Sequence, residues 1–132
     1  MAHYVGILDG SGNNWGVRIP DVPGCVGAGN TPDEAIASVT SALRDVMAHK
    51  ANGSFEIPTA RSVGDVLTSI GLTQGGMPVL IPLLLESGRL VKVNLMIDAG
   101  LLETIDQEAA RRKLSRSKFM ASAARDKIEA QR

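Results

Sequence analysis

The sequence has little cysteine, few aromatic residues and no long apolar segment. Its single cysteine, Cys25, excludes a disulfide within the chain. The longest apolar run, Met77 to Leu85, contains two prolines and spans nine residues, whereas a membrane-spanning helix needs about 20. The first residues lack the basic start and apolar stretch of a signal peptide. We therefore expect a cytoplasmic protein with no membrane partner, built from one or two small globular domains.

Residues suited to catalysis or metal binding are also scarce. Cys25 lies beside no basic residue that would activate its thiol, so a buried structural role is favoured. His3 and His49 fall in different elements and have no metal-ligand spacing with Cys25. Asp9 could belong to a metal-dependent nuclease, although a turn role explains it better. The sequence therefore predicts a non-enzymatic protein with no metal and no cofactor.

The net charge of zero conceals two halves of opposite sign. Residues 1–88 contain four basic and eight acidic side chains, whereas residues 89–132 contain the remaining ten basic and six acidic ones. The acidic N-terminal part and the basic C-terminal part indicate two surfaces with different partners. The basic surface suits a polyanion.

The pattern of the first 86 residues predicts an α+β domain with the element order βββα(α)β. Two strands, Tyr4–Leu8 and Trp15–Ile19, flank a cluster of Asp, Gly, Ser and Asn typical of a hairpin turn. A proline-rich turn then leads to a third strand near residues 25–29.

Two helices and a fourth strand are expected to complete this domain. Thr31 begins a helix that runs to about His49, because an N-cap threonine, a proline and two acidic residues follow one another, with Glu34 placed to close a capping box. A shorter helix follows Ser62. Val79–Leu85 is nearly all aliphatic, which is typical of a strand buried on both faces, although Pro82 favours an edge or a bulge.

Residues 86–88 form a predicted hinge, and residues 89–132 predict a strand followed by two helices. The strand, Arg89–Ile97, alternates between two faces. Asp98 is a suitable N-cap for a helix to about Lys113, and Ser115 for a last helix. The residues expected in a shared apolar core are Val91, Val93, Leu95, Ile97, Leu102, Ile105 and Phe119.

This strand-helix-helix segment is too small to be stable alone. It has about 44 residues, fewer than the ~70 that usually supply a sufficient core, and its strand has no partner within the segment. Two copies whose strands pair antiparallel would form a ribbon covered on its apolar side by four helices. The sequence therefore predicts a homodimer or a higher homo-oligomer.

The outer side of such a ribbon presents Lys92, Asn94 and Met96 twice. A two-stranded ribbon fits the DNA major groove, where Asn can bond adenine, Lys can reach guanine acceptors and Met can contact a thymine methyl. The start of the last helix offers free backbone N–H groups, hydroxyls and two cations, which suit a phosphate. The expected phosphate-binding residues are Ser115, Arg116, Ser117 and Lys118.

Two stretches of the sequence resemble a known family. Residues 15–25 (WGVRIPDVPGC), with Gly29–Thr31 and Glu34–Ala35, are similar to the signature of HicB antitoxins. Residues 95–119 resemble the ribbon-helix-helix (βαα) domain that one branch of that family carries at its C-terminus.

The resemblance implies domains at 1–86 and 89–132. The first would have a degenerate ribonuclease H-like fold and neutralise a HicA-type toxin, which is an mRNA-cleaving protein. The second would bind operator double-stranded DNA and repress the toxin-antitoxin genes. The residue-level reasoning leaves two alternatives open: a ribbon-helix-helix repressor whose first domain senses a small effector or another protein, and the nuclease that would use Asp9.

Overall fold

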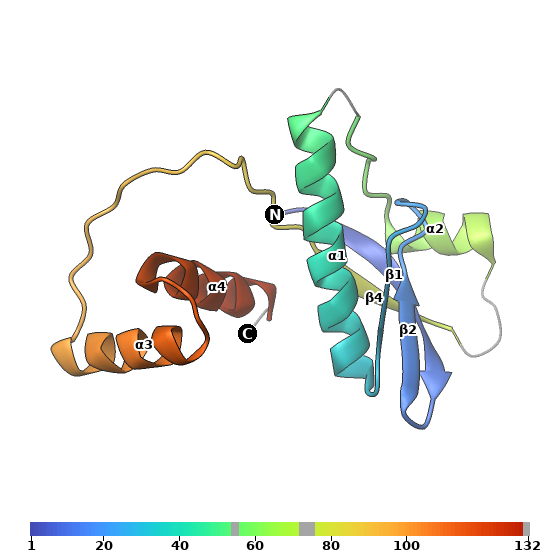
Figure 1. Ribbon diagram of the computed structural model, residues 1–132. Coiled ribbons are helices and arrows are strands. Elements are labelled where there is room, and N and C mark those ends of the chain that lie inside the picture. The colour runs from blue at the N-terminus through green and yellow to red at the C-terminus, as the bar shows by residue number, and fades with distance from the viewer. Residues whose placement is uncertain (54–55, 72–75, 131–132) are drawn as a thin grey trace. The chain divides into compact units, whose positions relative to one another are not determined.

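The computed structural model describes residues 1–53, 56–71 and 76–130, and it divides into two compact units (Figure 1). The N-terminal unit is Met1–Arg89 and the C-terminal unit is Leu90–Arg132. The boundary between them lies next to Gly88, which has a φ of 77°. The chain therefore divides where its composition and charge change.

The N-terminal unit is built on a four-stranded antiparallel sheet. Its strands are β1 (His3–Ser11), β2 (Asn14–Arg18), β3 (Val26–Gly29) and β4 (Met77–Pro82), in the spatial order β3-β2-β1-β4. The expected order of strands and helices in this part of the chain is confirmed. β4 is an edge strand in which Met77 and Leu80 are exposed, so burial of the aliphatic run on both faces is wrong, whereas the edge position that Pro82 favoured is confirmed.

Helix α1 (Pro32–Asn52) covers one face of the sheet (Figure 1). The Thr31 hydroxyl accepts a hydrogen bond from the Glu34 N–H. The Glu34 carboxylate in turn accepts one from the N–H of Asn30, whereas a capping box would use the N–H of Thr31. A stripe at helical spacing is fully buried against the sheet. Its residues are Ala35, Val39, Leu43 and Met47.

Glycine in β3 allows α1 to lie directly on that strand. A Cβ placed on Gly27 would lie 2.3 Å from the Val39 nitrogen, and one on Gly29 would lie 2.5 Å from the Glu34 Cβ. Real Cβ atoms do not approach other atoms this closely, so these two positions require glycine if the helix is to keep its distance.

Helix α2 (Val63–Ile70) packs on the opposite face of the sheet. Its fully buried residue, Val66, contacts a small core that includes Val5 and Ile7 of β1. Ser62 caps the helix by accepting a hydrogen bond from the Asp65 N–H. The unit therefore has three layers, with α1 and α2 on opposite sides of β1.

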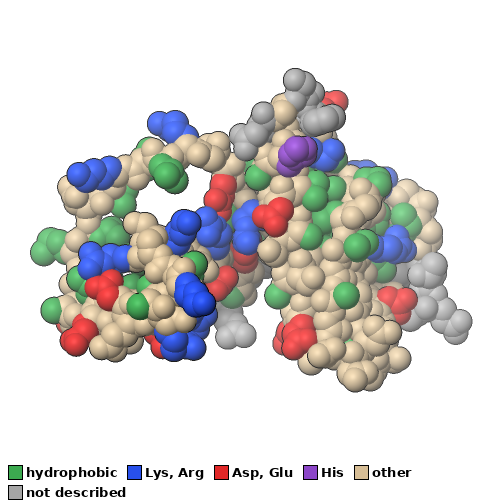
Figure 2. Space-filling model, in the orientation of Figure 1, with side chains coloured by type: hydrophobic (Ala, Val, Ile, Leu, Met, Phe, Trp, Pro, Cys, Tyr) green, Lys and Arg blue, Asp and Glu red, His purple; other side chains and the backbone are tan. Residues whose placement is uncertain are grey.

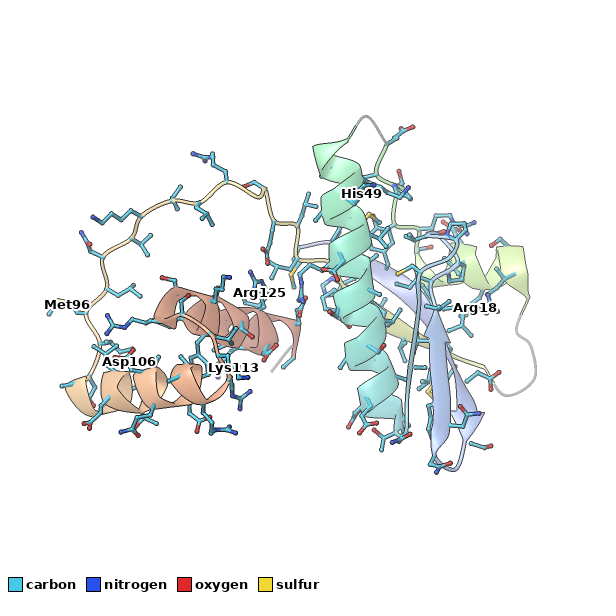
Figure 3. The ribbon with its side chains drawn as sticks, viewed as in Figure 1. Arg18, His49, Met96, Asp106, Lys113 and Arg125 are labelled. Carbon is cyan, nitrogen blue, oxygen red and sulfur yellow. The ribbon has the colours of Figure 1, made fainter. Side chains whose placement is uncertain are left out.

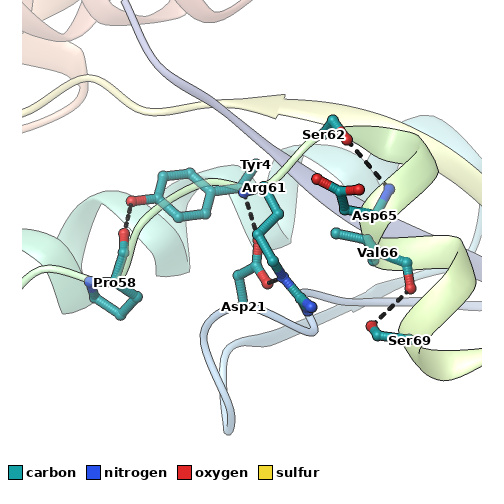
Figure 4. Close-up of polar contacts among 8 residues, drawn as sticks. All are labelled: Tyr4, Asp21, Pro58, Arg61, Ser62, Asp65, Val66 and Ser69. Carbon is teal, nitrogen blue, oxygen red and sulfur yellow. Dashed lines mark hydrogen bonds and ion pairs between the residues drawn. The ribbon is translucent and has the colours of Figure 1, made fainter.

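Polar contacts fasten the segment between the two helices (Figure 4). The Asp21 carboxylate accepts hydrogen bonds from the backbone N–H and from Nε of Arg61, at 2.9 and 2.6 Å. The Tyr4 hydroxyl donates to the Pro58 carbonyl. Asp21 therefore anchors Arg61, in the segment that leads from α1 into α2.

The C-terminal unit has two helices, α3 (Ala99–Arg111) and α4 (Arg116–Glu129). The side chains of Asp98 and Ser115 cap them as expected. Lys113, in the turn between them, has a φ of 59°. The expected strand at residues 89–97 is absent from the single chain, because these residues have no neighbouring strand with which to pair.

Candidate functional site

The three residues predicted to read DNA bases are all exposed. Lys92, Asn94 and Met96 lie in the segment that precedes α3. The Met96 side chain is fully exposed and points away from the helices (Figure 3). The structure of one chain therefore leaves all three side chains accessible to a ligand.

The opposite side of the same segment is apolar and equally uncovered. Val91, Val93 and Leu95 are each about two thirds exposed, at 65%, 66% and 65%. Three aliphatic side chains repeated at every second position form an apolar face if the segment is extended. A soluble protein rarely leaves such a face uncovered, so the segment has the properties of an interface.

The two helices do not form a complete core by themselves. Leu102, Ile105 and Phe119, which were expected in the shared core, are only partly buried. Ala109 is the one fully buried residue among the described part of this unit. The Arg112 guanidinium lies over the Phe119 ring, 6.0 Å from its centroid. The helices therefore offer partly covered apolar surface in addition to that of the segment before them.

The start of α4 has the geometry of an anion-binding site. The Ser115 hydroxyl accepts a hydrogen bond from the Lys118 N–H at 3.2 Å. The N–H groups of Arg116 and Ser117 belong to the first turn, where the helix supplies no acceptor. These N–H groups and the Lys118 ammonium would favour a phosphate oxygen, because the helix dipole is positive at this end.

Arg116 differs from the other predicted phosphate-binding residues, because its guanidinium is already paired. Its Nε and Nη2 donate to the two carboxylate oxygens of Asp106 in α3, at 2.9 and 2.8 Å. The hydrogen bond from Arg116 holds the pKa of Asp106 below its ordinary value, and the same bond raises the pKa of Arg116. Asp106 is not among the residues that the sequence predicted for this site, because no local pattern links it to Arg116.

Basic side chains gather on the C-terminal unit (Figure 2). Arg111 and Arg112 at the end of α3 both pair with Glu108, at 2.7 and 3.4 Å. These pairs are exposed, so salt and competing anions weaken them readily. The unit thus combines a basic surface with an uncovered apolar face.

The sequence favoured a turn role for Asp9, but Asp9 lies within β1 and pairs with Gly16 of β2. Its carboxylate accepts a hydrogen bond from the neighbouring Gly10 N–H at 2.8 Å. In the described residues, no group of three His, Cys, Asp or Glu side chains is placed to hold a metal ion. Cys25 is buried, and this burial raises the pKa of its thiol. None of the described helices combines the length and hydropathy needed to cross a membrane.

The fold resembles several solved antitoxin structures. The Burkholderia pseudomallei antitoxin HicB has 24% sequence identity and a TM-score of 0.54, with all of both chains covered. Antitoxin HicB3 has 24% identity and a TM-score of 0.52, covering 96% of this chain and 98% of that one. A toxin-antitoxin complex from Streptococcus pneumoniae has a chain with 17% identity and a TM-score of 0.51, with the same coverage. At these identities the likeness shows the fold.

The family is shown by the sequence itself. Residues 4–124 match the model described as the HicB-like antitoxin of bacterial toxin-antitoxin systems. No curated protein sequence matches the chain. The match extends over described parts of both units, and it confirms the family expected from residues 15–35. The chain belongs to the HicB-like antitoxin family of bacterial toxin-antitoxin systems and is a non-enzymatic antitoxin.

Proposed function

We propose that this antitoxin binds and neutralises a HicA-type mRNA-cleaving toxin and represses its own operon in the cytoplasm. The N-terminal unit, with a degenerate ribonuclease H-like fold, would bind the toxin. The C-terminal unit would form a ribbon-helix-helix dimer that binds operator DNA. Family membership supports the toxin partner, and the similar structures include a chain of a toxin-antitoxin complex.

One observation carries the DNA-binding half of this proposal. The segment 90–97 exposes aliphatic side chains on alternate residues and has no strand partner within the described chain. Two copies paired antiparallel would satisfy the backbone groups that each segment turns toward the other, and the helices of both copies would cover the apolar side of the ribbon. Lys92, Asn94 and Met96 would then lie on the outer face of the ribbon, in the arrangement that fits a major groove.

The start of α4 would clamp the DNA backbone beside the ribbon. Ser115 fixes the first turn, the N–H groups of Arg116 and Ser117 face an incoming phosphate, and Lys118 adds a positive charge. Arg116 would contribute mainly through its backbone, because Asp106 holds its guanidinium. These contacts would position the protein on DNA, whereas the ribbon side chains would select the sequence.

The dimer is tested with two lysine substitutions at adjacent positions. Leu95→Lys places a charge on the apolar face, so the full-length protein should become monomeric in size-exclusion chromatography with light scattering. Met96→Lys adds the same charge to the outer face and should leave the dimer intact while changing DNA binding. Equal effects of the two substitutions would contradict the alternation of faces and therefore the ribbon.

The partners are tested by co-expressing the chain with the small open reading frame next to its gene. We expect a stoichiometric complex in which the small protein loses its toxicity. We also expect this complex to bind the upstream promoter DNA and slow its migration in a gel. Asn94→Ala should weaken promoter binding and preserve the protein complex. Promoter binding by a chain that purifies with no protein partner would instead favour a repressor whose N-terminal unit senses a small effector or another protein.

A further inference from the structure

The first turn of α4 carries two cations and no acidic residue. Arg116 and Lys118 lie at the end of the helix where the backbone dipole is positive, and neither Asp nor Glu occupies that turn. Helices are stabilised by acidic side chains at this end, because the dipole and the free N–H groups repel a cation there. The residues of α4 by themselves therefore leave its start without a counter-charge.

The counter-charge comes from α3. Asp106, ten residues before Arg116, lies on that helix (Figure 3), and its two carboxylate oxygens accept hydrogen bonds from the Arg116 guanidinium at 2.9 and 2.8 Å. Two N–H groups that meet two carboxylate oxygens form the most directional kind of arginine pair. In the free chain, Asp106 thus binds a cation that lies beside the proposed phosphate site.

The backbone of the turn between the two helices keeps this pair in place. The Leu114 N–H donates to the Ala109 carbonyl at 2.8 Å, and the Lys113 N–H donates to the Ala110 carbonyl at 3.1 Å. Most exposed ion pairs are weak, partly because ordering two long side chains costs entropy. A hydrogen-bonded turn that already presents the two side chains to each other reduces this cost.

A phosphate at the start of α4 would meet the Asp106 carboxylate as well as the cations. If Arg116 stayed with Asp106, it would add little net charge to the site. If it turned to the phosphate instead, the ion pair would break and the carboxylate would be left near a second anion. In both cases Asp106 reduces the free energy gained from the phosphate. Lys118 is not opposed in this way, since it has no ion-pair partner among the described residues.

We propose that Asp106 is an internal competitor of the DNA phosphate, which neutralises Arg116 in the free chain and lowers the affinity of the α4 start for polyanions. The biological role rests on the DNA-binding half of the proposed function, whereas competition with a polyanion does not require an operator. Phosphate contacts carry no sequence information, so the carboxylate weakens binding to unrelated DNA and to the operator alike. Stable binding then depends more on the contacts that the ribbon adds.

The test compares two isosteric substitutions at exposed positions of α3 in the full-length chain. Asp106→Asn removes the charge that pairs with Arg116. Glu103→Gln, one turn earlier, is the matched control, because it removes a charge for which the described part of the chain provides no ion pair. We expect Asp106→Asn to bind unrelated duplex DNA about two- to fivefold more tightly than the wild type at low salt.

The salt dependence of that affinity should be steeper in Asp106→Asn by about one released counterion, because Arg116 becomes free to contact a phosphate. Glu103→Gln should leave the salt dependence unchanged and alter the affinity less. Equal changes in the two variants, or weaker binding by Asp106→Asn than by the wild type, would overturn the proposal.

Arg116→Ala distinguishes competition from a purely structural role of the pair. Competition predicts that this variant binds DNA more weakly than the wild type, because the carboxylate is left without its cation. The double variant Asp106→Asn, Arg116→Ala should then bind nearly as the wild type does. If the pair only held the two helices together, each single substitution would weaken binding and the double variant would not recover, which would contradict competition.

Elution from immobilised heparin, a sulfated polyanion, makes the result independent of an operator. Asp106→Asn should elute at a higher salt concentration than both the wild type and Glu103→Gln. If this difference appeared while the wild type failed to bind promoter DNA, the DNA-binding half of the proposed function would fail and competition at Arg116 would stand. Elution of Asp106→Asn together with Glu103→Gln would refute the competition, whatever the result with DNA.

Discussion

Asp21 and Arg61 are 40 residues apart in the sequence and are joined by two hydrogen bonds in the fold. The Asp21 side chain is only 5% exposed, whereas that of Arg61 is 41% exposed. The carboxylate therefore satisfies both a backbone and a side-chain donor of the segment that leads into α2. This contact connects the turn before β3 to Arg61, the residue that precedes the Ser62 cap of α2.

Asp21→Ala should lower the free energy of unfolding by about 1–3 kcal/mol, because it leaves the Arg61 backbone N–H without its acceptor. Urea denaturation of the full-length chain measures this change. Arg61→Ala should cost less, since the backbone hydrogen bond to Asp21 survives that substitution. Equal losses for the two variants would show that the side-chain ion pair, and not the backbone bond, carries the contact.

Gly27→Ala should destabilise the N-terminal unit by about 1–3 kcal/mol or more, because the new methyl group forces α1 away from β3. Gly64→Ala is the matched control within α2, where an added Cβ meets no atom within 4 Å. There the change should stabilise by about 0.5–1 kcal/mol, since glycine is a poor helix former. Thermal unfolding measures both, and a neutral Gly27→Ala would contradict the close packing of α1 on β3.

The pKa of the Asp106 carboxyl should lie below its ordinary value and should rise to that value in Arg116→Ala, because the hydrogen bond from Arg116 stabilises the charged form. A carboxyl titration followed by NMR measures the pKa. Since the folded-state pKa is the lower one, the ion pair contributes stability above the unfolded-state pKa, about 3.9, and this contribution is lost as the pH falls through the folded-state pKa. An unchanged Asp106 titration in Arg116→Ala would show that the pair does not persist in solution.

Lys118→Ala and Asn94→Ala should weaken DNA binding in different ways. Loss of Lys118 removes one phosphate contact, so affinity should fall for all sequences and the salt dependence should become shallower. Loss of Asn94 should cost about 1–3 kcal/mol for the operator and relax specificity at one base pair. Fluorescence anisotropy at several salt concentrations, with operator and unrelated DNA, separates the two. An Asn94→Ala variant that binds the operator as tightly as the wild type would show that the ribbon register is wrong.

Much of the candidate site could be predicted because its signals are local. Asp98 and Ser115 cap their helices as expected, since an N-cap side chain bonds to an amide two or three residues away. The alternation of apolar and polar residues in 90–97 likewise needs only neighbouring positions. What the sequence could not supply was the pairing of Arg116 with Asp106, which depends on the angle between α3 and α4.

The sequence by itself determined the order of strands and helices in the N-terminal unit, the caps at Thr31, Ser62, Asp98 and Ser115, and the family. Capping and periodicity depend on residues only a few positions apart, so they can be recognised in the sequence. Only the tertiary structure decided that Gly27 and Gly29 admit α1 and that Asp21 holds Arg61. Both depend on residues far apart in sequence that meet only when the sheet has formed.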